Sequence, residues 1–250
     1  MFSYQSESDP EAQLYMTAFV AAMRERGWSV GHNLQIDYRW TESDTRRIAR
    51  FASEVVALSP EVVLVAGGSH VGALQKVSRT VPIVFVQVAD AVGGGFVQSL
   101  SRPGGNATGF TNFDFNFSTK WLELLRQVAP GVARVAVLED PRNPSGAGQV
   151  GAIRAAAAAL SVDVVPISIA DPGEMERGIN AFASAPNGGL IVTPSGVAIV
   201  RRDLVISLAQ RHALPAIYPF RYFAEGGGLL SYGPDPLDQY RQAAGYVDRI

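Results

Sequence analysis

The chain has 250 residues, of which 47% are hydrophobic and 18% charged, a composition typical of one large or two modest globular domains. Its 21 basic and 23 acidic side chains give a net charge of −2 with no basic stripe, which argues against nucleic acid as a partner. The absence of cysteine excludes disulfides, thiolate nucleophiles and cysteine-based metal sites.

The two ends of the chain show no targeting or anchoring segment. No apolar run reaches the roughly 18 residues that a membrane-spanning helix needs. Residues 1–7 lack the basic and apolar regions of a signal peptide, and the chain stops at Ile250 inside a predicted helix. We therefore expect a chain truncated at both ends, including its C-terminus.

Hydrophobic periodicity predicts strands alternating with helices along the whole chain. In the first half it predicts a strand remnant at 1–4, a helix at 11–26 followed by Gly27, a strand at 34–40, a helix at 45–58, a strand at 61–66, a helix at 71–78, and strands at 83–88 and 108–112. In the second half it predicts a helix at 118–128, a strand at 132–138, a helix at 149–160, strand, helix and strand within 163–196, a helix at 199–211, strands at 216–218 and 228–232, and a helix at 236–250. Such alternation implies right-handed crossovers and parallel sheets.

An internal repeat is the most informative feature of the sequence. Residues 34–68 and 163–196 both read strand, polar break, helix, strand, in almost the same length. Residues 81–85 are answered by 214–218, and 93–97 by 226–230. Two similar βα halves predict two similar lobes, and we expect the function in the cleft that two such lobes form.

Ligands of parallel α/β sheets bind beyond the carboxyl ends of the strands. The residues predicted there offer hydroxyls, amides, few carboxylates and several aromatic rings, a set suited to a small zwitterion with an apolar or aromatic side chain. The candidate ligand-binding residues are Ser8, Trp40, Ser69, Asp90, Asn112, Asn143, Ser195, Tyr218 and Phe220.

Two serines of this set are predicted to occupy matching positions, each opening a helix. Free backbone N–H groups there favour a carboxylate beside Ser69 and Ser195, and Asp90 is suited to an ammonium group. Structural roles compete with these: serine is a common N-cap, and Asp90 can brace a turn. The aromatic residues at 218–223 can belong to a core, and Trp40 can serve either packing or a pocket.

Catalytic motifs are weak. Residues 146–151 match the dinucleotide fingerprint G-x-G-x-x-G, but residues 139–145, with two prolines, separate it from the preceding strand. Residues 67–71 miss the nucleophile elbow because Val71 replaces its last glycine. His32, His70 and His212 show no metal-ligand spacing, and we expect each to be a surface or capping residue. Nothing in the sequence demands catalysis, a metal or a cofactor.

Residues 99–110, SLSRPGGNATGF, closely resemble the SLARPGGNxTGF signature of a family of bacterial ABC-transporter substrate-binding proteins that includes tryptophan- and tyrosine-binding members. Further matches extend the resemblance over the chain, at residues 31–40, 82–85, 120–125, 129–132, 214–218 and 231–233.

This resemblance implies a type I periplasmic-binding fold, with two doubly wound parallel-sheet lobes joined by crossing segments. Lobe one would comprise residues 1–111 and 234–250, and lobe two residues 112–233. The implied function is a monomeric, non-enzymatic solute receptor, periplasmic or lipid-anchored at the cell surface. It would close its lobes on a small molecule, for which we favour an apolar or aromatic amino acid, and deliver it to an ABC-transporter permease.

Two other functions stay open at this point. Effector domains of sugar repressors share the implied fold, so a sensory or regulatory ligand-binding module is an alternative. An NAD-dependent oxidoreductase would rest on residues 146–151 alone.

Overall fold

The computed structural model describes residues 1–250, apart from the side chains at positions 115 and 116. The chain divides into two compact units, which we call unit 1 (Met1–Asn112 and Asp235–Ile250) and unit 2 (Phe113–Pro234). Each boundary lies one residue later than in the sequence prediction. Phe113 begins unit 2 because its ring packs 5.4 Å from the rings of both Trp121 and Phe220.

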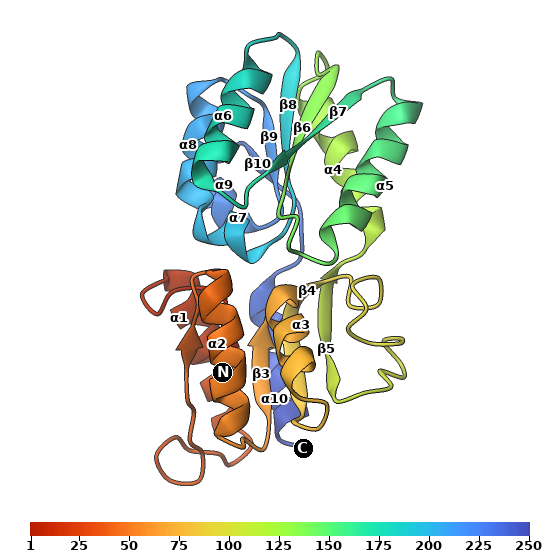
Figure 1. Ribbon diagram of the computed structural model, residues 1–250. Helices are drawn as coiled ribbons and strands as arrows, with labels where there is room; N and C mark the ends of the chain where they lie inside the picture. The colour runs from red at the N-terminus through yellow and green to blue at the C-terminus, as the bar shows by residue number, and fades with distance from the viewer. The chain divides into compact units, whose positions relative to one another are not determined.

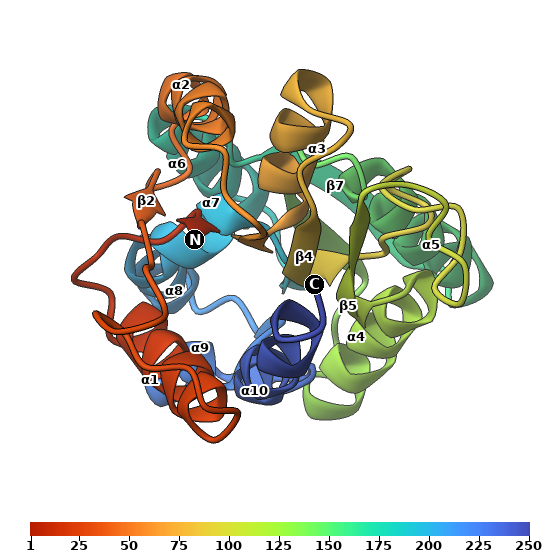
Figure 2. The ribbon, with the colours of Figure 1, turned by 90° about the horizontal axis from the view of Figure 1, so that it is seen from below.

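Unit 1 is a five-stranded sheet in the order β2-β1-β3-β4-β5, and the pairs β1–β2, β1–β3 and β3–β4 are parallel. Helices α2 and α3 cover one face, and α1 and α10 cover the other (Figure 2). Its elements are β1 (Phe2–Ser3), α1 (Pro10–Arg24), β2 (Arg39–Trp40), α2 (Thr45–Ala57), β3 (Val63–Ala66), α3 (Gly68–Val77), β4 (Ile83–Ala89), β5 (Ala107–Phe113) and α10 (Pro236–Val247).

Unit 2 is a second five-stranded sheet, in the order β10-β9-β8-β6-β7, and its strand pairs are parallel. Helices α4 and α5 pack together on one face, and α6 and α8 cover the other (Figure 1). Its elements are α4 (Phe115–Val128), β6 (Arg134–Glu139), α5 (Gly146–Ala159), β7 (Asp163–Ser168), α6 (Pro172–Ala183), β8 (Gly188–Val192), α7 (Gly196–Val200), α8 (Arg202–Arg211), β9 (Ala216–Tyr218), α9 (Arg221–Glu225) and β10 (Leu230–Ser231).

Both sheets have the same topology. Counted within its own unit, each sheet runs second, first, third, fourth, fifth strand. The internal repeat corresponds to the second strand, the following helix and the third strand of each sheet, β2-α2-β3 and β7-α6-β8. The predicted fold class, two doubly wound parallel-sheet units, is thereby confirmed.

Several elements differ from their predicted bounds, for local reasons. The strand predicted at 34–40 is reduced to Arg39–Trp40, because residues 29–34 form a turn in which the Asn33 side chain accepts a hydrogen bond from the Ser29 backbone. The strand remnant at 1–4 is β1, a fully buried inner strand. The helix predicted at 199–211 is split at Arg201 into α7 and α8, and α9 was not predicted.

The continuous apolar runs of the sequence are buried strands. All seven residues of β4 and all five of β8 are buried, as expected where helices cover both faces of a parallel sheet. Trp121 is fully buried in unit 2, and its indole N–H donates to the Tyr232 carbonyl at 2.8 Å. Among the described residues, no helix combines the length and apolar character that crossing a membrane would require.

Candidate functional site

In this topology the crossovers change direction between the first and third strands, and ligands bind at the carboxyl ends beside that point. In unit 1 this is the edge where β1 and β3 end, and in unit 2 the edge where β6 and β8 end. We describe the polar groups of each edge separately.

A buried hydrogen-bonded pair follows β2 and β3 in unit 1. His70 is 2% exposed, and its Nε2 lies 2.7 Å from the Thr41 hydroxyl, which also contacts the Ser3 carbonyl at 3.2 Å. Thr41 has one proton and Ser3 offers only an acceptor, so Thr41 donates to Ser3 and accepts from His70. Burial lowers the pKa of His70 to about 3, which keeps the imidazole neutral. The expectation of a surface or capping histidine is therefore wrong for His70.

A second buried network surrounds Gln87, close to the end of β4. The Gln87 side-chain oxygen accepts from the hydroxyls of Tyr4 at 2.8 Å and Tyr240 at 3.1 Å. Its backbone N–H donates to the side chain of Gln239 at 2.8 Å, and its φ is +54°. The Gln87 side-chain nitrogen is buried and has no hydrogen-bond partner among the described residues.

The residues predicted from sequence in unit 1 fall into different surroundings. Ser8 is exposed, with its hydroxyl 3.4 Å from that of Ser6. Trp40 is half-buried and stacks on Tyr38 with ring centroids 5.7 Å apart. Asp90 accepts from a backbone N–H three residues on, at 2.8 Å, and so braces a turn.

Ser69 and Asn112 lie at the carboxyl edge of the unit 1 sheet without a structural partner in the part of the chain described. Ser69 is a half-buried residue in the first turn of α3. Asn112 is 7% exposed and ends unit 1, and both polar atoms of its amide are buried and unpartnered. Buried polar groups in native proteins are nearly always satisfied, so this unpartnered amide is a candidate contact for a bound molecule.

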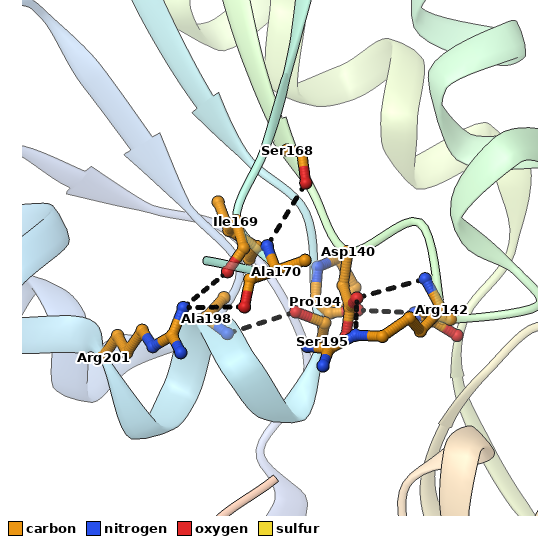
Figure 3. Close-up of polar contacts among 10 residues, drawn as sticks. Asp140, Arg142, Ser168, Ile169, Ala170, Pro194, Ser195, Ala198 and Arg201 are labelled. Carbon is orange, nitrogen blue, oxygen red and sulfur yellow. Dashed lines mark hydrogen bonds and ion pairs between the residues drawn. The ribbon is translucent and has the colours of Figure 1, made fainter. Parts of the chain in front are cut away.

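The unit 2 edge carries two guanidinium groups beside one buried carboxylate (Figure 3). Asp140, directly after β6, accepts from the Arg142 Nε at 2.8 Å. Arg201 donates to the carbonyl of Ile169 at 2.7 Å, and burial together with the charge of Arg142 lowers its pKa. Arginine stays charged, and Asp171 acts on Arg201 together with Asp140, so the two guanidinium groups at this edge are charged N–H donors that lie near two carboxylates.

Asn143 and Ser195 belong to the loops that follow β6 and β8 of unit 2. Pro194 and Ser195 of the second loop are labelled in Figure 3. The Asn143 amide donates to the Pro194 carbonyl at 3.1 Å. The Ser195 hydroxyl accepts from the backbone N–H of Ala198 at 3.2 Å and is the N-cap of α7. Ser69 and Ser195 lie at matching positions, each three residues after the third strand of its unit, but Ser69 lies inside the first turn of α3, whose N-cap is Gly67.

The two aromatic candidates of unit 2 are buried among other rings. Tyr218 is 1% exposed and stacks on Phe223 at 5.2 Å, and burial raises its pKa to about 12. Phe220 is 2% exposed and lies edge-on to Phe113. These contacts are those of a packed core, the structural role that competed with ligand binding for both residues.

The dinucleotide fingerprint finds no support in its surroundings. Gly146 opens α5, but β6 ends at Glu139, so six residues lie between strand and helix. The third glycine of the fingerprint normally allows a helix to pack closely on the sheet. Gly151 is exposed, and a Cβ there would meet nothing within 4 Å. Among the described residues no group of three or more metal-ligating side chains occurs.

Sequence reasoning missed two groups of polar residues. They are the arginines at the unit 2 edge and the partners of Gln87 in unit 1. Arg142 follows β6 by three residues, and its position after a strand was a usable signal. Tyr240 and Gln239 lie on α10, more than 150 residues from Gln87, and no local pattern connects them. Arg201 was predicted inside a single helix, so its contact with the end of β7 could not be foreseen.

The family model for ABC transporter substrate binding proteins matches residues 7–250. The chain belongs to this family. The substrate-binding protein is 24% identical over 217 residues to a protein of Clostridioides difficile named tyrosine-binding protein. This match covers 87% of the chain and 62% of its relative, so the chain spans less than two thirds of the relative's length.

Solved structures share the fold of this substrate-binding protein. An ABC domain from Streptococcus pneumonia in complex with L-Trp superposes with a TM-score of 0.89 at 20% identity, covering 99% of this chain and 82% of that one. A conserved domain protein from Vibrio cholerae gives a TM-score of 0.89 at 22% identity, with the same coverage. A periplasmic sugar-binding protein from Legionella pneumophila gives 0.65 at 13% identity, over 98% of this chain and 92% of that one.

Proposed function

We propose that this protein is an extracytoplasmic receptor that binds a small molecule, an amino acid with an apolar or aromatic side chain, and delivers it to an ABC-transporter permease. Family membership over residues 7–250 carries the receptor function. The relative named tyrosine-binding protein and the L-Trp complex support the ligand class. The receptor would act without catalysis, as a monomer, in the periplasm or anchored by lipid at the cell surface.

The polar groups at both edges support a ligand that carries a carboxylate. In unit 1 they are neutral donors, such as the Asn112 amide and the first N–H groups of α3 at Ser69. In unit 2 the guanidinium groups of Arg142 and Arg201 supply positive charge. Charge-assisted hydrogen bonds to a carboxylate are about twice as strong as neutral ones, so these groups favour an acid over a neutral sugar.

Within the candidate set, we propose Ser69 and Asn112 as polar contacts and Trp40 as an apolar contact, since Trp40 is half-buried and already stacked on one ring. Ser8 is exposed and lies after β1, and stays a prediction. Asp90, Asn143 and Ser195 already hold turns and loops together, so we propose that they shape the edges. Closure of the two lobes on the ligand also stays a prediction.

The test is a thermal-shift screen of the purified protein against the twenty amino acids, purines, sugars and NAD. A ligand at a hundred times its dissociation constant stabilises a fold by about 2.7 kcal/mol, which moves the melting temperature by several degrees. We expect a shift with one class of amino acid, confirmed by calorimetry. The Asn112→Ala variant should weaken that ligand at least tenfold, and the Ser53→Ala variant, at an exposed position of α2, is the control. A shift with NAD alone would overturn the proposal.

A further inference from the structure

We propose that the side-chain N–H group of Gln87 is a ligand-binding donor of unit 1, and that it takes a carboxylate oxygen of the ligand. This inference rests on the proposed function and assigns a specific contact within it. Gln87 is outside the set that sequence reasoning selected, because it lies within β4 and reads as a strand residue.

The two tyrosines fix which way the Gln87 amide points. Burial raises the pKa of Tyr240, so its phenol stays protonated and has a proton to donate to the Gln87 amide oxygen. The Tyr240 and Tyr4 hydroxyls lie 3.1 and 2.8 Å from the same amide oxygen, whose two lone pairs can accept both. The amide nitrogen therefore points away from the tyrosines with both of its hydrogens unused.

The Gln87 side-chain nitrogen has no hydrogen-bond partner in the part of the chain that the structure describes, although the side-chain oxygen of the same residue is held by two hydroxyl groups. Gln87 is 7% exposed, and its nitrogen is buried without a partner among the described residues. A buried donor without a hydrogen bond is unfavourable, and an acceptor on a ligand would recover that loss. A side chain held by two hydroxyls is also preorganised, so binding costs little side-chain entropy.

The backbone at Gln87 is held in a conformation that a plain strand residue would avoid. Its φ of +54° is uncommon for a residue with a Cβ, and Gln239 on α10 holds it by accepting the Gln87 backbone N–H at 2.8 Å. The strand pairs with β3 up to Val86, so the turn of the backbone begins where that pairing ends. Strain of this kind persists where surrounding structure enforces it, and it concentrates at ligand-binding positions.

The neighbours of Gln87 at the carboxyl edge also favour a ligand. Asn112, another residue of unit 1 whose amide is buried and unpartnered, lies on β5, the neighbouring strand of the sheet. Tyr4 packs against Gly67 at the start of α3, where a Cβ would come within 2.9 Å of the tyrosine ring. The Tyr4 ring thus links Gln87 to the loop that opens α3, beside the predicted contact Ser69.

A carboxylate is the acceptor that suits this donor. The free group of Gln87 has only N–H donors, so its partner must be an acceptor. A carboxylate is the strongest acceptor that an amino acid offers at neutral pH. The imidazole of His70 in the same unit is neutral, so it supplies no competing positive charge.

The experiment replaces the donor without removing the acceptor that the tyrosines need. Gln87→Glu keeps an oxygen for Tyr4 and Tyr240 but turns the free N–H group into a carboxylate oxygen. Dissociation constants are measured by calorimetry for L-tyrosine and L-tryptophan, and for their carboxamides, which lack the negative charge. The matched control is Gln75→Glu, the same change in the second half of α3, where the side chain donates to the Phe96 carbonyl at 2.9 Å.

We expect Gln87→Glu to weaken the amino acids at least tenfold and to change the carboxamides less than threefold, while Gln75→Glu changes neither. Equal weakening of acids and carboxamides, or no weakening, would overturn the inference and leave the proposed function standing. If the unmodified protein binds neither amino acid, the proposed ligand class fails and the contact at Gln87 fails with it.

A second measurement uses the unmodified protein and so does not depend on the folding of a variant. The side-chain amide protons of Gln87 are followed by NMR in ¹⁵N-labelled protein as L-tyrosine is added. A new hydrogen bond to a carboxylate should move one of them downfield and slow its exchange with solvent. The same signals staying in place at saturation would contradict the proposed contact.

Discussion

The buried imidazole of His70 predicts a loss of stability in unit 1 when the pH falls below neutral. The folded chain holds this group neutral, with a pKa lowered by burial to about 3 from an ordinary value of 6.5. The unfolded chain binds the proton near pH 6.5. Acid therefore favours the unfolded state, and the stabilising contribution is complete above pH 6.5 and disappears between pH 6.5 and about 3.

The size of the effect follows from the distance between the two pKa values. Each pH unit below 6.5 lowers the free energy of unfolding by about 1.4 kcal/mol, until the pKa of His70 in the folded state is reached. Between pH 7 and pH 5 the loss is thus about 2 kcal/mol, a large share of the 5–15 kcal/mol that stabilises an ordinary domain. Protonation also places a charge beside the ring of Phe2, whose centroid lies 4.6 Å from that of His70.

The assay compares the unmodified protein with His70→Gln, whose amide nitrogen can still donate to the Thr41 hydroxyl but does not titrate. Hydrogen exchange in urea, read on peptides that cover β3 and α3, reports the stability of unit 1 at pH 7, 6 and 5. All other titratable groups are the same in both proteins, so their contributions cancel in the difference.

The expected result is a difference between the two proteins that grows by about 2 kcal/mol from pH 7 to pH 5, because only the unmodified chain carries His70. Parallel pH dependences would refute the reasoning. So would an NMR titration that finds the imidazole of His70 protonating near pH 6.5 in the folded protein.

Two further predictions concern local packing. Gly109 has φ +153°, and a Cβ there would collide with the backbone carbonyl of Phe85. Gly109→Ala should therefore lower the free energy of unfolding of unit 1, measured in urea, by at least about 2 kcal/mol. In the control Gly105→Ala, where a Cβ would meet nothing within 4 Å, the change should stay within about 0.5 kcal/mol. Asp140→Ala removes the buried carboxylate that Arg142 contacts at 2.8 Å, and should lower the stability of unit 2 by about 1–3 kcal/mol; an unchanged melting temperature would show that the guanidinium group needs no partner there.

The sequence by itself determined the repeated architecture. The period of a hydrophobic pattern is a local property, so the continuous apolar run at 83–88 predicted β4, and the repeat of 34–68 in 163–196 predicted two units of one kind. The signature at 99–110 identified the family. The same reasoning placed Asn112 at a strand end, where the structure leaves its amide buried and unpartnered.

Short elements lack enough residues to show a period, so α9 was not predicted and the strand remnant predicted at 1–4 could not be placed within a sheet. Two buried residues, Phe2 and Ser3, form an inner strand of the unit 1 sheet, and their role comes from pairing with β2 and β3. The break at Arg201 was also hidden, and so was the contact of its guanidinium group with the Ile169 carbonyl, which comes from another part of the chain.

Only the tertiary structure decided which polar groups meet. Tyr4, Gln87 and Tyr240 are spread over the full length of the chain, and they share one hydrogen-bonded network because α10 returns to the first sheet. Burial likewise made His70 a neutral core residue, although its sequence neighbours are two glycines and a serine on one side. Local sequence patterns determine the helices and strands, whereas long-range packing determines which polar side chains become hydrogen-bond partners. At the carboxyl edges of both sheets, those partners decide the protonation and the free donors of each side chain.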